Sequence, residues 1–212
     1  MYKFLSYLLI VIYFFNLNPA EALLSLKERT FYVKFIVADY AINKFILKES
    51  FKLAKVKFRK IGVIIKLRKI YYVKDFTSSL RAPEYFYTRF YKWINAYKNK
   101  RVKRKTFTMF IVTPIVNEFG GNLYGGLGYV CGEVGHNFSM IHAHYNIYRV
   151  ALVMAHELGH NLGAIHDDYI IPSVMNSNAS FTCAPNYNCD FSLESKKDIK
   201  YWLRFEKREG EI

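Results

Sequence analysis

The sequence predicts a single α/β domain with a mixed sheet. Segments rich in β-branched and aromatic residues alternate along the chain with segments of helical periodicity, which is typical of domains that pack helices on a sheet. No internal repeat interrupts this alternation. The chain has 212 residues, of which 52% are hydrophobic, so it can bury a core large enough for one globular domain.

The N-terminal residues have the features of a secretory signal peptide. Lys3 precedes an apolar stretch at residues 5–17, and the sequence Pro19-Ala-Glu-Ala22 offers a small-x-small cleavage site. The apolar stretch is shorter than the ~20 residues that cross a bilayer, which favours cleavage over the alternative of a membrane anchor. We therefore predict a signal peptide at residues 1–22 and a secreted, extracellular domain at residues 23–212.

The first half of the domain contains three expected elements and the start of a fourth. Residues 31–38 have the composition of a central strand buried on both faces. A Lys-rich, partly helical stretch follows at residues 43–59, and residues 61–67 again have strand composition. Pro83 stands where a helix can begin, and aromatic residues recur after it at helical spacing to residue 98.

The second half continues the alternation. We expect residues 98–105 to form a solvated basic loop rather than a processing site, because cleavage there would split the domain. Strands are expected at residues 106–112 and 138–143, and a closing amphipathic helix at residues 192–208. The glycine-rich residues 120–128 lack the Lys and Ser/Thr of a phosphate-binding loop, so they do not indicate a nucleotide site.

A helix expected at residues 150–162 carries the most specific signal. His156 and His160 are four residues apart, so both imidazoles leave the same face about one turn from each other, which is the spacing that zinc needs. Glu157 projects beside the metal as the candidate general base. Two histidines and a glutamate on an otherwise apolar helix would be costly as core residues alone.

A third ligand follows the helix. Gly163 allows the chain to leave the helix at positive φ, and the turn back brings His166 to the other two histidines. Three protein ligands leave a fourth position for water, which is the arrangement of one catalytic Zn²⁺ ion. The run His156-Glu-Leu-Gly-His-Asn-Leu-Gly-Ala-Ile-His166 fits the extended metzincin pattern at every defined position, and Met175 follows nine residues later.

On these residues the chain resembles the reprolysin or adamalysin branch of the metzincins, which includes snake-venom metalloproteases and the catalytic domains of ADAM proteins. Asp167, directly after the third histidine, is typical of that branch. The resemblance implies a metzincin-type catalytic domain, with an upper subdomain to about residue 163 and a small lower subdomain after it, below the zinc cleft. It also implies that Met175 is a hydrophobic floor beneath the ligands and that Asp167 is structural.

The resemblance further implies a substrate strand. Leu127, Gly128 and Tyr129 resemble part of the edge strand along which peptide substrates pair antiparallel.

The three cysteines, Cys131, Cys183 and Cys189, leave the disulfide pairing open. Secretion favours pairing, and an odd count leaves one thiol free or bonded to another molecule. The resemblance places Cys131 just after the edge strand, but Glu194 stands where the family's partner cysteine is expected. Cys131 therefore pairs with Cys183 or Cys189 or stays free, and of these we expect the pair Cys131 and Cys189.

The chain is strongly basic, with 31 Lys and Arg against 17 Asp and Glu and a formal net charge of +14. Such a charge favours encounter with anionic surfaces such as sulphated glycans, although a biased composition rich in Lys, Ile, Tyr and Phe explains it equally well. We expect no nucleic acid partner, because the chain has no recognisable nucleic-acid-binding motif.

Two sequons and three further histidines complete the candidate residues. Asn137 and Asn178 begin Asn-x-Ser sequons, which are glycosylation acceptors in a secreted chain. His136, His142 and His144 have no ligand partners at useful spacing, so we expect surface or structural roles for them.

These observations predict a monomeric zinc-dependent metalloendopeptidase that hydrolyses peptide bonds of extracellular matrix or host proteins. The alternative is a secreted basic binding toxin or pseudoprotease with a structural zinc ion. The intact Glu157 favours the enzyme, because a structural site needs no base. The altered cysteines and the lack of a propeptide between signal and domain favour the alternative.

Overall fold

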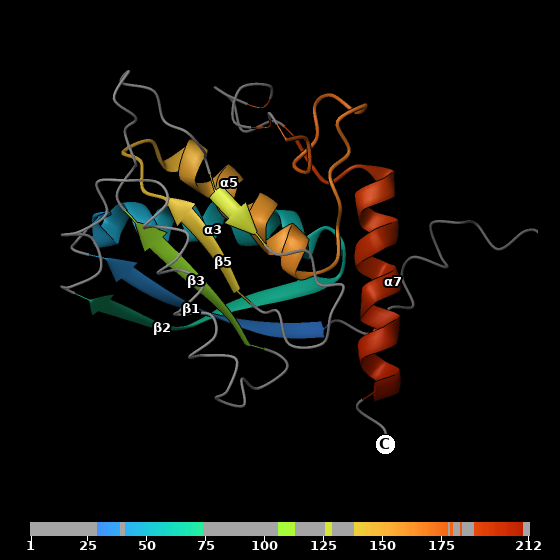
Figure 1. The fold of residues 1–212 in the computed structure, drawn as a ribbon, viewed down its shortest axis with the longest axis horizontal. Coiled ribbons are helices and arrows are strands. Elements are labelled where there is room, and N and C mark those ends of the chain that lie inside the picture. Colours follow the sequence, from blue (N-terminus) through green and yellow to red (C-terminus); the bar gives the residue numbers. More distant parts are fainter. Residues whose placement is uncertain are drawn as a thin grey trace, which may run out of the picture.

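A five-stranded sheet lies at the centre of the fold (Figure 1). This computed structural model describes residues 29–38, 41–73, 106–112, 126–128, 138–177, 179, 183 and 189–209. The strands are β1 (Arg29–Ala38), β2 (Val63–Val73), β3 (Thr106–Val112), β4 (Gly126–Gly128) and β5 (Phe138–His142). The predicted signal peptide, the helix expected after Pro83 and the basic loop expected at residues 98–105 lie outside the described residues.

The strand order is β2-β1-β3-β5-β4. β1 pairs in parallel with β2 and β3, and β3 pairs in parallel with β5, whereas β4 is antiparallel to β5. Parallel neighbours need a crossover connection, and helix α3 (Lys44–Arg59) provides it between β1 and β2. The predicted mixed sheet and the central position of β1 are therefore confirmed.

The side chains of β1 alternate between two environments. Phe31, Val33, Phe35 and Val37 are fully buried in the main core, whereas Tyr32 is 40% exposed. Because successive side chains of a strand point to opposite faces, only one face of β1 is buried along its whole length. The prediction that this strand is buried on both faces is wrong at Tyr32.

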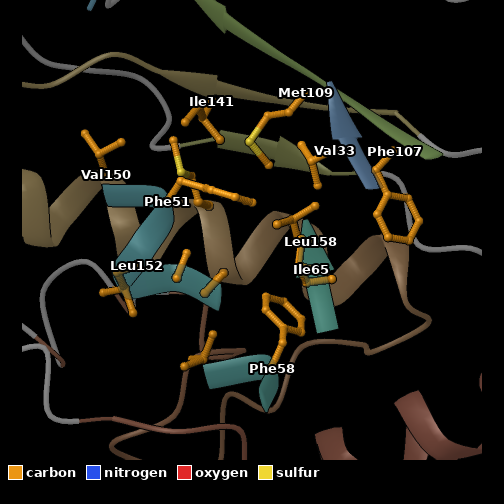
Figure 2. Close-up of a cluster of buried hydrophobic side chains, with 14 of the residues drawn as sticks. Val33, Phe51, Phe58, Ile65, Phe107, Met109, Ile141, Val150, Leu152 and Leu158 are labelled. Carbon is orange, nitrogen blue, oxygen red and sulfur yellow. The ribbon is translucent and has the colours of Figure 1, made fainter. Parts of the chain in front are cut away.

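Two helices cover one face of the sheet. α3 begins at its N-cap Asn43, whose side chain accepts a hydrogen bond of 2.7 Å from the amide of Phe45. α5 (Ile147–Asn161) packs beside it, and the Ser50 hydroxyl of α3 donates to the carbonyl of Ile147 at 3.0 Å. Figure 2 shows side chains from both helices meeting those of the strands in one core: Val33, Phe51, Phe58, Ile65, Phe107, Met109, Ile141, Val150, Leu152 and Leu158.

The closing helix α7 (Leu193–Glu209) lies at the N-terminal end of β1, apart from the other two helices (Figure 1). The rings of Trp202 and Phe31 have centroids 5.7 Å apart, and the Arg29 guanidinium donates to the carbonyl of Leu203. These contacts fix the end of the chain against the first strand. Among the described residues, no helix is both long enough and apolar enough to cross a membrane.

Two glycines with positive φ offer a matched test of how closely α7 packs against the end of α5. Gly62 has φ +75 with nothing within 4 Å of an added Cβ, whereas Gly163 has φ +89 and an added Cβ would lie 2.8 Å from Cβ of Trp202. We expect Gly62→Ala to cost about 1–2 kcal/mol through the left-handed backbone alone. Gly163→Ala should cost about 1–3 kcal/mol more through overpacking. Urea unfolding of both variants checks this, and equal losses would show that Trp202 does not restrict Gly163.

Candidate metal centre

The C-terminal half of α5 positions the first two histidines. Its N-cap Asn146 accepts hydrogen bonds from the amides of Tyr148 and Arg149 at 2.9 and 3.1 Å. His156 and His160, one turn apart, project from the same side of the helix, and their rings are 4.7 Å apart at an interplanar angle of 88°. The helix therefore presents two imidazoles to one point, as the spacing predicted.

A Schellman turn ends the helix and returns the chain to the site. The Gly163 amide donates to the carbonyl of His160 at 2.9 Å, and the Ala164 amide donates to that of Gly159 at 3.0 Å. This hydrogen-bond pair requires a left-handed residue, and Gly163 with φ +89 supplies it. His166 then lies close to the two helical histidines, and Gly163 has the positive φ that we expected at the helix end.

The three histidines converge on one another with their Nε2 atoms. The separations are 3.1 Å between His156 and His160, 3.2 Å between His156 and His166, and 3.1 Å between His160 and His166. A zinc ion bound tetrahedrally at about 2.0–2.1 Å from each nitrogen separates its ligand atoms by about 3.3 Å. The triangle of nitrogens therefore fits a zinc ion, and it is the one group of three such donors in the described part of the chain.

Backbone carbonyls fix which nitrogen of the helical histidines carries the proton. His156 Nδ1 lies 2.7 Å from the carbonyl oxygen of Val174, and His160 Nδ1 lies 2.8 Å from that of Ala164. A carbonyl only accepts, so both Nδ1 atoms donate, and in the neutral rings both Nε2 atoms carry lone pairs. Two lone pairs that face each other at 3.1 Å repel, so a bound cation would stabilise the arrangement.

Burial keeps these two imidazoles neutral. It lowers the pKa of His156 to about 4, although the hydrogen bond to Val174 favours the charged form. It lowers the pKa of His160 to about 3, and the charge that His156 carries when it is protonated lowers this pKa further. Both rings are therefore deprotonated at neutral pH, which is the form that binds a metal.

Glu157 lies in the same turn of α5 as the ligands. Its side chain is 3% exposed, and its Oε2 atom is buried without a hydrogen-bond partner among the described residues. Burial raises the pKa of Glu157 well above its usual range. A carboxylate with an uncommitted oxygen beside a metal site can accept and return a proton.

Asp167 connects the third histidine to two other segments. Its Oδ2 atom accepts hydrogen bonds from Ser173 Oγ at 2.6 Å and from Ser195 Oγ at 2.7 Å, and its amide donates to the carbonyl of Met175 at 3.2 Å. Asp167 is 7% exposed. The residue after His166 thus ties the loop to residues 173–175 and to the first turn of α7, in keeping with the structural role expected for it.

Met175 packs directly against α5 at Gly159. The side chain is fully buried, and a Cβ added at Gly159 would lie 2.5 Å from the Met175 sulfur. Only a residue without a side chain lets this methionine approach the helix so closely. Met175 therefore lies against the helix that carries His156 and His160.

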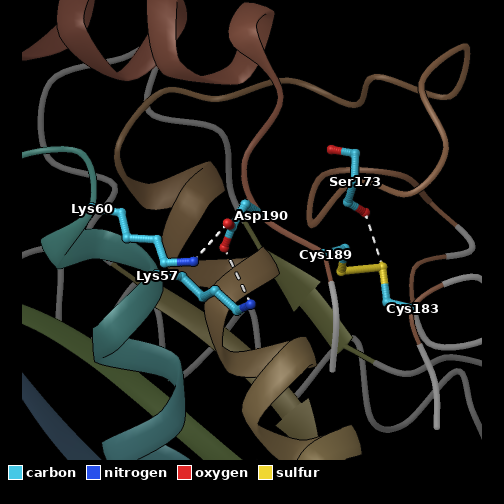
Figure 3. Close-up of polar contacts among 6 residues, drawn as sticks. All are labelled: Lys57, Lys60, Ser173, Cys183, Cys189 and Asp190. Carbon is cyan, nitrogen blue, oxygen red and sulfur yellow. Dashed lines mark hydrogen bonds and ion pairs between the residues drawn. A yellow bond between two sulfur atoms is a disulfide. The ribbon is translucent and has the colours of Figure 1, made fainter. Parts of the chain in front are cut away.

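The segment that carries Val174 and Met175 is also held from its other side. Ser173 and Asp190 form an isolated parallel bridge, in which the Val174 amide donates to the carbonyl of Asp190 at 3.1 Å. The Asp190 carboxylate contacts Lys57 Nζ at 3.2 Å and Lys60 Nζ at 2.7 Å, both at the end of α3 (Figure 3). α3 is thus linked through Asp190 to Val174, whose carbonyl orients His156.

The disulfide differs from the expected one. Cys183 is bonded to Cys189, and Cys183 Sγ lies 3.5 Å from the carbonyl oxygen of Ser173 (Figure 3). The predicted pair Cys131 and Cys189 is therefore wrong, because the sulfur of Cys189 is already bonded to Cys183, six residues away, and both cysteines are buried. Cys131 itself lies outside the described residues.

The remaining predicted site residues lie partly within and partly outside the residues that the structure describes. Leu127 and Gly128 belong to β4, at the edge of the sheet, whereas Tyr129, Asn137 and Asn178 lie outside the described residues, as does His136.

The two other described histidines stand apart from the metal centre. His142 is 8% exposed at the end of β5, and His144 accepts a hydrogen bond from the Asn146 amide at 2.9 Å before α5. Neither belongs to the group of metal-binding donors.

Sequence reasoning missed the atoms that orient the ligands. The carbonyls of Ala164 and Val174 and the hydroxyls of Ser173 and Ser195 form the surroundings of the three histidines. Carbonyls occur at every residue and serines are common, so no sequence signal distinguishes these positions. The one sequence signal for the surroundings of the ligands was Gly163, a glycine directly after the expected helix, which indicated that the chain would turn back there.

Comparison with known protein families gives one match. A sequence model described as Reprolysin (M12B) family zinc metalloprotease matches residues 47–208, which is more than half of the chain. The match begins in α3 and ends in α7, so it includes the whole metal centre. No curated protein matches the chain.

The buried histidines predict that the metal-free protein loses stability in acid. Burial lowers the pKa of His142 to about 4, as it does for His156, and that of His160 to about 3. In the unfolded chain these groups titrate near 6.5, so between pH 6.5 and 4 the unfolded state binds more protons. Glu157, whose pKa is raised by burial, acts in the opposite direction, but it is one group against three, so the stability should still decrease as the pH falls from 6.5 toward 4.

Urea unfolding of the chelator-treated protein at pH 7.5, 6 and 5 measures this decrease. In a variant with His156→Asn and His160→Asn the decrease should be smaller, because only His142 then remains of the three. A free energy of unfolding that does not change across this pH range, or that rises as the pH falls, would contradict the assignment of neutral buried rings.

Asp167 and its neighbour Asp168 provide a matched pair of substitutions. Asp167 is buried and its Oδ1 atom has no hydrogen-bond partner among the described residues, whereas Asp168 is exposed and accepts from the Ser177 amide at 2.7 Å. Asp167→Asn should cost about 1–3 kcal/mol, because it weakens two short hydrogen bonds and buries an unpaired amide group. Asp168→Asn should cost less than about 0.5 kcal/mol. Denaturant midpoints compare the two, and similar losses would argue against an anchoring role for Asp167.

Proposed function

Because the chain belongs to the reprolysin (M12B) family of zinc metalloproteases, we propose that it is a secreted endopeptidase with Glu157 as its general base. The observation that carries this proposal is the pair of inward-facing Nε2 lone pairs, held 3.1 Å apart on His156 and His160. A third nitrogen on His166 completes the triangle. We propose that these three histidines hold one zinc ion.

Three protein ligands suit catalysis, because they leave a coordination position open. Zinc, when bound, polarises a peptide carbonyl and makes water more acidic. The chain's own contribution is to keep both helical rings neutral and correctly oriented through Val174 and Ala164. We propose that the burial of His156 and His160 also prevents protons from competing with the metal ion for their Nε2 atoms.

Glu157 is the residue that we propose to move the proton. It follows the ligand His156 directly and precedes the ligand His160 by three residues, so it projects on the ligand side of α5. Its raised pKa suits a group that first accepts a proton from the attacking water and then donates it to the leaving amine. The uncommitted Oε2 atom is available for both transfers.

We propose that substrate peptides bind along β4. This short strand lies at the outer edge of the sheet, antiparallel to β5, and Leu127 pairs with Met140 in its register. A peptide can add to such an edge through main-chain hydrogen bonds. In Figure 1, β4 lies close to α5, so a peptide on this edge would run near the histidines.

Extracellular proteins are the substrates that we propose. The apolar stretch at residues 5–17 supports secretion, and the disulfide between Cys183 and Cys189 suits an oxidising compartment. We also propose that the enzyme acts as a monomer, with the residues after Gly163 forming the lower part of the catalytic domain.

The test is proteolysis by the mature chain and by its Glu157→Gln variant. The variant keeps the three histidines, so we expect unchanged zinc content and a turnover lower by about 10²–10⁴-fold, because a general base contributes an effect of this size. Mass spectrometry of the products from a mixed protein substrate measures both activity and cleavage preference. Wild-type protein treated with a chelator serves as the control without metal.

Two results would contradict the proposal. Cleavage by the Glu157→Gln variant at nearly the wild-type rate would exclude Glu157 as the base. Absence of products from zinc-loaded wild-type protein would argue for a non-catalytic binding protein.

A further inference from the structure

One face of α3 carries an unusual row of positive charges. Five basic residues along its length are exposed, and we call them the basic stripe: Lys44, Lys48, Lys52, Lys55 and Arg59. At 3.6 residues per turn they fall within an arc of about 80° and extend over about 22 Å of the helix. They therefore form a single line on the surface rather than a general scatter of charge.

The basic stripe has little compensation from acidic groups. α3 contains one acidic residue, Glu49, which forms an ion pair of 2.6 Å with Lys52. Lys57 of the same helix is turned inward, is 8% exposed and contacts Asp190. Lys57 thus contributes to the fold from a buried position and with an acidic partner. All five stripe residues are exposed, and among the described residues only Lys52 has an acidic partner.

The arrangement is unfavourable for the isolated helix. Lys44 and Lys48, Lys48 and Lys52, and Lys55 and Arg59 are like-charge pairs four residues apart, and each such pair destabilises a helix by about 0.2–0.5 kcal/mol. α7 shows the usual solution, because its sequence LESKKDIKYWLRFEKRE places four acidic residues among six basic ones. The stripe of α3 lacks this mixture, so an anionic ligand would relieve repulsion that the protein does not relieve itself.

We propose that the basic stripe binds a linear sulphated glycan. A polyanion with charges along its length matches a line of cations on a helix whose backbone is already held in place by the packing of its apolar side.

The burial of α3 argues against a lipid membrane as the partner. A membrane-surface helix needs a free apolar face to insert, but Leu47, Phe51, Ala54 and Phe58 of α3 are at most 5% exposed in the core. The exposed apolar side chains of this helix, Phe45 and Val56, lie near its opposite ends and do not form a stripe. What α3 offers to a partner is therefore charge along a line.

Two variants of the full chain test the proposal. The stripe variant carries Lys44→Gln, Lys48→Gln, Lys55→Gln and Arg59→Gln, and the matched α7 variant carries Lys196→Gln, Lys197→Gln, Lys200→Gln and Arg204→Gln. Each lowers the formal net charge by four on an exposed or partly exposed helix surface. The probe is a heparin dodecasaccharide, measured by calorimetry at several salt concentrations, with anionic phosphatidylserine vesicles as the second probe.

We expect the wild-type chain to bind the dodecasaccharide and to lose affinity as salt increases, because binding releases counterions. The stripe variant should bind roughly 30-fold more weakly, since four exposed ion pairs of modest strength are lost, and its salt dependence should be weaker. The α7 variant should bind within about threefold of wild type. Equal loss in both variants, unchanged binding by the stripe variant, or binding of the vesicles but not of the oligosaccharide would overturn the proposal.

Thermal unfolding provides a second measurement that does not depend on the binding assay. The dodecasaccharide should raise the Tm of the wild-type chain and the α7 variant but not that of the stripe variant, because a ligand stabilises the state to which it binds. Without ligand, the stripe variant should unfold at a higher temperature than wild type at low salt, because like-charge repulsion is removed. A stripe variant with a lower Tm in the absence of ligand would show that these cations stabilise the fold and would argue against a binding role.

Discussion

The whole site depends on three imidazole nitrogens being held within 3.1–3.2 Å of one another. Without a cation this arrangement is repulsive, since the carbonyls of Val174 and Ala164 force the lone pairs of His156 and His160 toward each other. The fold must therefore supply the energy that keeps the ligands together. A helix of fixed geometry holds two of them, and the chain that follows the helix must return at a defined angle to deliver the third.

The segment at residues 164–175, which follows α5 and returns to the histidines, is rigid because several parts of the chain hold it. Asp167 binds the hydroxyl of Ser173 and, through its amide, the carbonyl of Met175. The backbone carbonyl of Asp190 accepts a hydrogen bond from the Val174 amide, and its carboxylate forms ion pairs with Lys57 and Lys60 at the end of α3. Met175 can reach α5 only because Gly159 has no side chain. Displacement of the segment by a fraction of an ångström would therefore disturb several contacts at once, and this resistance keeps the His156 ring oriented.

The sequence was informative wherever spacing determines geometry. The interval between His156 and His160 and the glycine at position 163 predict the helical ligands and the turn, and the apolar runs predict most of the sheet. It was not informative where the partner is a backbone atom or lies far along the chain. Ser195 reaches Asp167 across 28 residues, and Cys189 bonds to Cys183 although we expected Cys131 as its partner. Such contacts are decided by packing in three dimensions, which local patterns do not record.

Helix α3 joins the metal centre to the surface of the molecule. Its apolar side packs on α5 and the sheet, its C-terminal lysines hold Asp190, and its basic stripe faces solvent. A polyanion bound along the stripe would therefore be attached to the same rigid body that carries the histidines. No conformational change is needed for such binding to influence proteolysis, because it would fix the position of the site relative to the polymer. Substrates attached to that polymer would then be present at a high effective concentration, and the selectivity would come from location rather than from additional contacts in the site.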